Sequence, residues 1–214
     1  MSLFITEIFY SIQGESVFNG RPCIFVRLSG CNLRCSYCDT RYAYENGPKI
    51  SLTDIYTEVA QYNCQLVEIT GGEPLIQQDT SELIHHLIEN GFEVMLETNG
   101  TFDTGEIDIR CMKIVDIKCP SSNESDKNNF INLKRLAEKD QIKFVIGTRE
   151  DFDYAKSILE IHRPELPAGN ILFSPVSPVL SAEKLAKWIL EDNLNVRLQL
   201  QFHKLLWPDK DHGV

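Results

Sequence analysis

The sequence predicts an α/β fold: an open, partial barrel of mostly parallel strands, formed by one domain over residues 1–214. Short β-branched runs alternate with helical patterns along the chain, and this alternation implies right-handed parallel crossovers. Seven candidate strands are too few for a closed eight-stranded barrel, and a chain of 214 residues is shorter than the about 250 residues that such a barrel takes. No repeat, low-complexity tract or Pro/Gly/Ser linker divides the sequence.

The predicted strands are short apolar runs rich in Val and Ile. In chain order they are residues 24–28, 66–70, 94–97, 113–117, 142–146, 171–173 and 196–200. Apolar stripes with helical spacing lie between them, over residues 52–60, 83–88, 130–137, 152–159 and 185–189. The first begins with Ser51 and Asp54 in capping-box spacing, Gly91 is expected to end the second, and Pro164 follows the fourth.

Polar, Gly-rich or Pro-rich segments follow several strands directly. They are Thr-Gly-Gly-Glu-Pro at 70–74, Glu-Thr-Asn-Gly at 97–100, residues 116–121 and Ser-Pro-Val-Ser-Pro at 174–178. Each alone reads as a turn that ends a strand. Because the carboxyl ends of parallel strands face one side of the sheet, where ligands bind, their recurrence predicts one shared site.

Composition excludes several classes of function. The net charge of -10 argues against broad nucleic-acid binding, which needs clustered Lys and Arg, but it permits a local basic pocket for an anionic small molecule. No apolar run approaches the ~20 residues that cross a bilayer, and no secretory signal opens the chain. We therefore expect a cytoplasmic protein that binds neither nucleic acid nor membrane.

Three of the seven cysteines crowd into eight positions: Cys31, Cys35 and Cys38 have the spacing C-x3-C-x2-C and follow the strand that ends at Leu28. Three soft thiolates on one loop suit an iron–sulfur cluster or zinc. Structural zinc sites complete a tetrahedron with a fourth Cys or His, often from a second close pair, and this chain has no such pair. A cluster held by three cysteines leaves one iron open to an external ligand. Cys23, Cys64 and Cys111 are expected to be small core residues.

The cysteine motif, with Tyr37 before Cys38, resembles the hallmark of the radical S-adenosylmethionine (SAM) superfamily. Residues 71–74 resemble its Gly-Gly-Glu-Pro motif and residues 97–100 its Glu-Thr-Asn-Gly segment. The resemblance implies a TIM-like partial barrel and a [4Fe-4S] cluster on Cys31, Cys35 and Cys38. It also implies SAM at the free iron, cleaved reductively to a radical that takes hydrogen from the substrate.

Four further segments resemble the 7-carboxy-7-deazaguanine synthase family: residues 8–16, 25–31, 38–40 and 201–207. This resemblance implies conversion of 6-carboxy-5,6,7,8-tetrahydropterin to 7-carboxy-7-deazaguanine with release of ammonia, a step toward queuosine and other 7-deazapurines. It also implies a homodimer and an electron donor such as flavodoxin or ferredoxin. A glycyl-radical activase is the alternative enzyme, although activases usually lack the Gln13–Glu15 segment. A non-catalytic zinc or iron–sulfur module gives no reason for the other two motifs.

The family resemblance also implies the roles of single residues. The SAM site would comprise Tyr37, Cys38, Asp39, Gly72, Asn99, Asp116, Lys118, Cys119 and Ser121. The pterin site would comprise Ile12, Gln13, Gly14, Glu15, Arg27, Thr70, His203 and the C-terminal carboxylate of Val214. The hydroxyl of Thr40 would bind Mg²⁺, a hard cation that prefers oxygen. No side chain is assigned as a catalytic acid, base or nucleophile, because the cofactor carries the chemistry.

Several of these residues also have a plain structural reading. Gln13-Gly14 fits a turn, Arg27 a surface strand position, Thr40 a local backbone cap and His203 a core histidine. A guanidinium fork nevertheless matches a substrate carboxylate well. Asp116-Ile117-Lys118 stands where many relatives carry Ser-Pro-Lys, so only Lys118 matches securely there.

Overall fold

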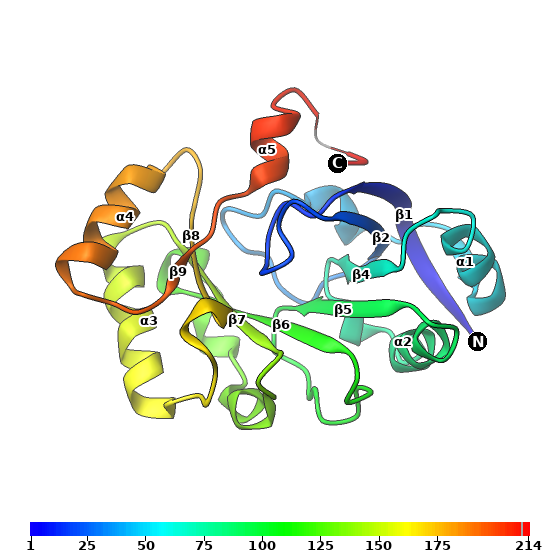
Figure 1. Ribbon diagram of the computed structural model, residues 1–214, viewed down its shortest axis with the longest axis horizontal. Coiled ribbons are helices and arrows are strands. Elements are labelled where there is room, and N and C mark those ends of the chain that lie inside the picture. The colour runs from blue at the N-terminus through cyan, green and yellow to red at the C-terminus, as the bar shows by residue number, and fades with distance from the viewer. Residues whose placement is uncertain (211) are drawn as a thin grey trace.

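The computed structural model describes residues 1–210 and 212–214. In this part of the chain one sheet has the strand order β3-β1-β2-β4-β5-β6-β7-β8-β9 (Figure 1). The strands are β1 (Ser2–Ile12), β2 (Pro22–Leu28), β3 (Lys49–Ser51), β4 (Leu66–Gly71), β5 (Glu93–Thr98), β6 (Met112–Ile117), β7 (Gln141–Ile146), β8 (Ile171–Pro175) and β9 (Arg197–Leu198). The α-helices are α1 (Leu52–Val59), α2 (Thr80–Glu89), α3 (Arg149–His162), α4 (Ala182–Glu191) and α5 (Phe202–Leu206).

The predicted fold class is confirmed. Every neighbouring pair from β2 to β9 is parallel, and the outermost strands of the described sheet, β3 and β9, do not pair with each other, so the barrel is open. β1 and β3 were not predicted; both pair antiparallel at one end of the sheet. The alternation that identifies a strand is interrupted in β1, because its register shifts between Ile5 and Glu7.

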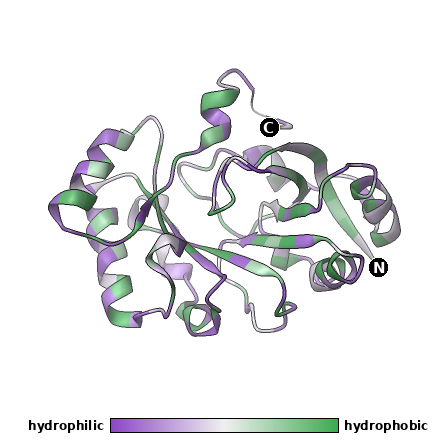
Figure 2. Ribbon diagram, in the orientation of Figure 1, coloured by the Kyte–Doolittle hydropathy of each residue, from purple (hydrophilic) through white to green (hydrophobic). Residues whose placement is uncertain are grey.

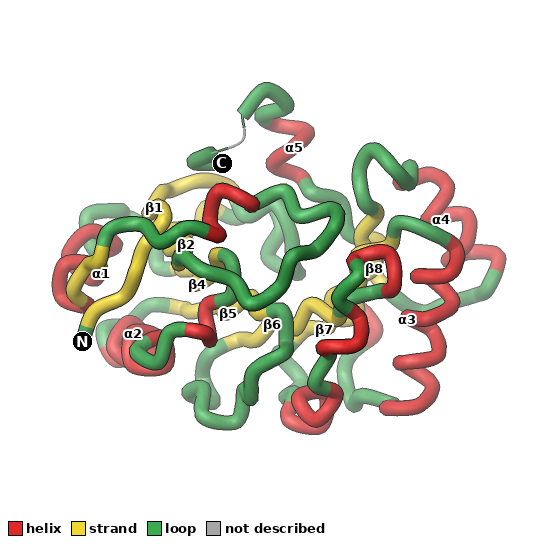
Figure 3. The backbone as a smooth tube through the Cα atoms, turned by 180° about the vertical axis from the view of Figure 1, so that it is seen from behind, coloured by secondary structure: helices red, strands yellow, loops and turns green. Residues whose placement is uncertain are grey.

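The helices cover the outer face of the sheet in two groups. α1 and α2 lie beside the first strands, and α3 and α4 lie at the other end, as Figures 1 and 3 show from opposite sides. The first apolar cluster includes Val26, Ile69, Leu83 and Leu87 and packs behind β1–β5. A second cluster packs α3 and α4 against β6–β9. Each helix carries hydrophobic and hydrophilic residues together, as amphipathic helices do (Figure 2).

The concave face has an apolar floor below a polar layer. The floor comprises Phe9, Cys23, Phe25, Leu66, Met95, Met112 and Ile114. Successive side chains of a strand alternate between faces, so residues two positions further along the same strands point into the same space. These positions are charged or polar: Arg27 follows Phe25 and Asp116 follows Ile114. The sheet therefore presents polar groups at the carboxyl ends of its strands.

Helix ends match the sequence signals in part. Ser51 caps α1 through the amide of Asp54, but the Asp54 carboxylate takes the Ser51 hydroxyl and does not complete the box. A full capping box stands at α3, between Thr148 and Asp151. Gly91 follows α2 with a φ of 87°, as expected of a residue that ends a helix.

Two expected elements differ. The stripe at 130–137 forms a 3-10 helix over Phe130–Arg135, because the buried Asn132 side chain is tied to the carbonyls of Gly100 and Phe102. The expected strand at 196–200 shortens to β9, and α5 follows it with no buried residue. None of the helices in the described residues has the length and apolarity to span a membrane.

Candidate active site at the carboxyl ends of the strands

A cavity of about 390 Å³ opens above the polar layer. It is lined by residues from β2, β4, β5, β6 and β7, from the cysteine loop and from the C-terminal segment. All of the predicted site residues line it except Cys119 and Ser121. Segments far apart in the sequence thus converge on one space, which is large enough for small-molecule ligands.

Cys119 and Ser121 lie behind the lining. Cys119 is fully buried in the second apolar cluster. The Ser121 hydroxyl donates to Asp151 at 2.6 Å and its carbonyl accepts from the Ser36 hydroxyl, also at 2.6 Å. These contacts support the cysteine loop, and direct SAM contacts by the two residues stay a prediction.

The cysteine loop, residues 31–38, is held from below. Leu33 is buried, the Cys38 amide donates to the Cys35 carbonyl at 3.2 Å, and the Ser36 amide donates to the Ser122 carbonyl at 3.1 Å. Burial raises the pKa of Cys31, and it raises the pKa of Cys35 to about 11. The thiols therefore keep their protons until a metal displaces them.

The three thiols of the loop suit an iron–sulfur cluster. Within the residues that the structure describes, no three His, Cys, Asp or Glu side chains converge as one metal ion requires. In an iron–sulfur cluster each thiolate binds a different iron, so the three sulfurs need not meet at one point. Cys31, Cys35 and Cys38 all face the cavity, where a fourth ligand has access.

Two buried polar atoms beside this loop lack a partner among the described residues: the Tyr37 hydroxyl and Oδ1 of Asp116. Both residues line the cavity. The other oxygen of Asp116 accepts from Lys118 Nζ at 2.8 Å. Buried polar groups are normally hydrogen-bonded, so these atoms fit a ligand that offers polar groups of its own.

The Gly71-Gly72-Glu73 turn brings β4 against the cysteine loop. A Cβ on Gly72 would collide with the carbonyl of Gly30 and with Cys31 Cβ, so only glycine allows this approach. Glu73 is fully buried and is not among the described residues that line the cavity. It accepts hydrogen bonds from the amide of Asn99 at 2.7 Å and the hydroxyl of Thr98 at 2.7 Å, and so fixes the loop after β5.

A network of charges lies deeper in the cavity. Lys143 Nζ on β7 donates to Glu15 at 2.7 Å and also to Glu97 on β5. Burial favours its neutral form, but the two carboxylates hold the pKa of Lys143 well above its usual value. Burial, followed by the nearby Glu97, raises the pKa of Glu68, which accepts a bond from Gln13.

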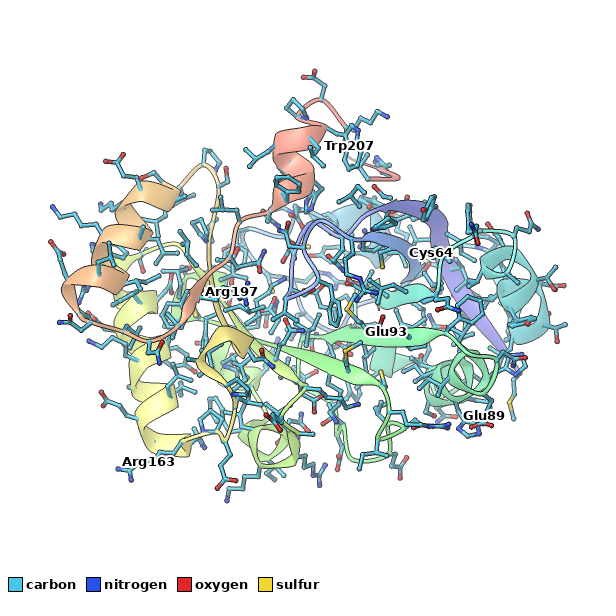
Figure 4. All side chains as sticks on the ribbon, in the orientation of Figure 1. Cys64, Glu89, Glu93, Arg163, Arg197 and Trp207 are labelled. Carbon is cyan, nitrogen blue, oxygen red and sulfur yellow. The ribbon has the colours of Figure 1, made fainter. Side chains whose placement is uncertain are left out.

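The C-terminal strap, which we define as residues 199–210 and 212–214, covers the cavity. Gln201 donates to Glu15 at 3.0 Å, and Lys204 donates to Asp39 at 2.7 Å. His203 packs on Gly14 so closely that a Cβ there would collide with its ring. Burial lowers the pKa of His203, which favours the neutral imidazole near pH 7. Figure 4 shows Trp207 at the end of α5.

Comparison with known proteins agrees with this geometry. The family model of the radical SAM superfamily matches residues 25–119. A 7-carboxy-7-deazaguanine synthase of Chlorobaculum tepidum is 43% identical over 215 residues, which cover 99% of this chain and 97% of that protein. One of Koribacter versatilis is 41% identical, over 98% of this chain and 99% of that protein.

The chain belongs to the 7-carboxy-7-deazaguanine synthase family. The crystal structure of QueE from Escherichia coli resembles it with a TM-score of 0.80 and 26% identity, covering 95% of each chain. The predicted family and enzyme class are thereby confirmed. As a radical SAM enzyme of this family, the chain uses SAM and a [4Fe-4S] cluster.

Several residues that line the cavity of this member of the 7-carboxy-7-deazaguanine synthase family were not recognised from the sequence. Glu68 and Lys143 line it and were not predicted as site residues, while Glu97 was predicted only as part of the segment 97–100 and given no role. Each is a charged residue in a mostly apolar strand, in the runs Leu-Val-Glu-Ile-Thr, Val-Met-Leu-Glu-Thr and Gln-Ile-Lys-Phe-Val. Burying a charged side chain costs free energy unless the charge is paired. A charged residue within an apolar strand is therefore a sequence signal for a buried, paired site.

Proposed function

We propose that the chain converts 6-carboxy-5,6,7,8-tetrahydropterin to 7-carboxy-7-deazaguanine and ammonia, within 7-deazapurine biosynthesis. One observation carries the proposal: a single cavity joins the three-cysteine loop to Arg27, Gln13 and His203. The first part suits a radical-forming cofactor and the second a carboxylated, hydrogen-bonding heterocycle. The full-length similarity to proteins named for this product supports the same assignment.

Cys31, Cys35 and Cys38 would hold the cluster, and Tyr37, Asp116 and Lys118 would offer polar groups to SAM. When bound, the cluster and SAM supply the radical that removes a hydrogen atom from the pterin. The close approach at Gly72 and the Asn99 side chain, which donates to Asn32 at 3.0 Å, keep the neighbouring loops fixed around this space.

The pterin would lie between the polar layer and the strap. Arg27 on β2 stands in register with Thr70 on β4, so both project into the same end of the cavity. The guanidinium binds the substrate carboxylate, while Gln13 and Glu15 offer partners to the polar ring edge. The strap excludes water through its contacts with Glu15 and Asp39 and carries Val214 to the cavity.

We further propose Mg²⁺ near Thr40. Among the described residues its hydroxyl caps no backbone group but donates to the Asp39 carboxylate at 3.0 Å, and both residues line the cavity. Oxygen donors of this kind suit Mg²⁺, which shares its coordination with substrate oxygens and water. A flavodoxin- or ferredoxin-type electron donor and a homodimer complete the proposal, on the strength of the family resemblance.

The decisive experiment is anaerobic incubation of the reconstituted protein with the carboxypterin, SAM, Mg²⁺ and a reductant, followed by mass analysis. We expect a deazaguanine product and released ammonia. Recovery of unchanged pterin from protein with a SAM-responsive four-iron spectrum contradicts the proposed substrate and favours the activase.

The cluster role is tested by one substitution. Cys35→Ala removes one of three thiolates, so we expect cluster absorbance and turnover to disappear together. Cys64→Ala is the matched control, because Cys64 lies outside the cavity and packs against the apolar clusters. Turnover by the Cys35 variant refutes the cluster assignment.

A further inference from the structure

Glu7 faces the cavity end of β2 because of an irregularity in β1. Ile5 pairs with Leu28 and Glu7 pairs with Arg27, so β1 advances two residues while β2 advances one. In a regular ladder Thr6 would stand opposite Arg27. Such bulges re-aim side chains and are frequent next to active sites. Here the bulge exchanges a threonine for a carboxylate as the cross-strand partner of Arg27.

Three groups bind the Glu7 carboxylate. One oxygen accepts from Arg27 Nε at 2.8 Å and from the Tyr42 hydroxyl at 2.8 Å. The other oxygen accepts from the Gly213 amide of the strap at 3.2 Å. The side chains of Glu7 and Arg27 are only 18% and 14% exposed, so the pair is shielded from water.

The Arg27 guanidinium is held by one edge. The rings of Phe9 and Tyr42 lie 5.8 Å and 5.9 Å from its central carbon. Its bonds to the described residues use Nε and neither terminal nitrogen. The two terminal nitrogens, with their four N–H donors, therefore remain free as a planar fork, and such a fork matches a carboxylate with two parallel bonds.

We propose that Glu7 is a positioning residue: by binding Nε of Arg27, it presents the terminal fork of the guanidinium to the substrate carboxylate and so makes the cavity selective for carboxylated pterins. The inference rests on the proposed function and adds a residue to it. Tyr42 shares the oxygen of Glu7 that binds Nε and Gly213 binds the other oxygen, and these two bonds fix the carboxylate in place. Binding by Gly213 also ties the strap to the same residue.

The test is Glu7→Gln in the full-length reconstituted enzyme. The bond to Nε loses its charge assistance while the shape is kept, so we expect the KM for the carboxypterin to rise about tenfold with kcat nearly unchanged. Calorimetry of the carboxypterin and of tetrahydropterin without the carboxylate should show their affinity ratio falling by the same factor. Glu93→Gln is the matched control: it removes a 2.8 Å bond to Arg21 on the surface, where the side chains are 40% and 48% exposed.

A double-mutant cycle separates positioning from general stability. Arg27→Met should abolish the preference for the carboxylated ligand, and adding Glu7→Gln to it should change the affinity ratio no further. Equal loss of affinity for both ligands in Glu7→Gln, or additive effects, overturns the inference. The ratio of the affinities for the two pterins is a binding measurement, so it can be determined even if the protein shows no turnover. A wild-type chain that discriminates but yields no deazaguanine defeats only the proposed reaction, and an unchanged ratio in Glu7→Gln defeats only the role of Glu7.

Discussion

At the scale of single residues, Glu68 shows how the polar layer differs from a surface. Its side chain lies in the middle of β4 and is 4% exposed. Burial and the neighbouring Glu97 raise its pKa, while the bond from Gln13 lowers it in part. The folded chain therefore binds this proton more tightly than the unfolded chain does, and Glu68 carries a proton where an exposed glutamate has lost it.

This linkage predicts a pH effect on stability. The contribution of Glu68 is full below the unfolded pKa of 4.5 and is lost as the pH rises toward the raised folded value. Glu68→Gln mimics the protonated form at every pH. Urea unfolding between pH 5 and pH 8 should therefore show the free energy of unfolding of the variant rising relative to that of the wild type. The difference should grow by at most about 1.4 kcal/mol per pH unit.

Glu183→Gln, an exposed position on α4, is the control and should leave the pH profile unchanged. Parallel stability curves for the wild type and Glu68→Gln would mean that Glu68 is ionised in the folded chain.

At the scale of elements, hydrogen bonds from the start of α3 help to position the cysteine loop. The buried Asp151 carboxylate accepts from the amides of Gly147 and Ser121, both at 2.8 Å, and from the Ser121 hydroxyl. The Ser121 carbonyl in turn holds Ser36 of the cysteine loop. A helix cap thus reaches the candidate cluster site through one intervening segment.

Asp151→Ala leaves several buried donors without partners, so we expect it to lower the free energy of unfolding by roughly 3 kcal/mol or more. Asp153→Ala, on the same helix, removes a surface pair with Arg149 and should cost at most about 0.5 kcal/mol. Chemical unfolding of both variants measures the difference. Equal losses in the two variants would show that the cap bonds add nothing beyond an exposed pair.

The features that could be predicted from the sequence are those marked by residues close together along the chain. The parallel strands, the helices with strong stripes and the cysteine, Gly72 and Asn99 segments are marked by contiguous patterns. β1 escaped because its bulge breaks the alternation, and α5 because five residues without burial leave no stripe. The pairing of Lys143 with Glu15 and Glu97, and of Glu7 with Arg27, arises from sheet order and register, which a linear pattern does not contain.

At the scale of the whole molecule, the strap has little buried anchorage: among its described residues only Gln199 is buried. Its helix, α5, buries no residue, and polar bonds from Gln201, Lys204 and Gly213 hold it in place. Segments with few buried apolar contacts open at low free-energy cost. Entry of a ligand beneath the strap therefore needs no movement of the sheet.

Hydrogen exchange tests this difference. Strap amides should exchange much faster than those of β4–β7 in the free protein and should slow when the carboxypterin is added. Trp207 lies within the strap, so its fluorescence in a Trp188→Phe background gives a second reading. Strap amides as protected as the central strands would contradict the expected opening.

The division of the outer core into two clusters has a consequence for how such a protein tolerates change. Substitutions behind β1–β5 and behind β6–β9 strain different sets of neighbours, so each half can be repacked without disturbing the other. On the concave side, the ion pairs of Lys143 with Glu15 and Glu97 link the two halves of the sheet. Residues on the outer helices can therefore be substituted while the side chains that line the cavity keep their positions.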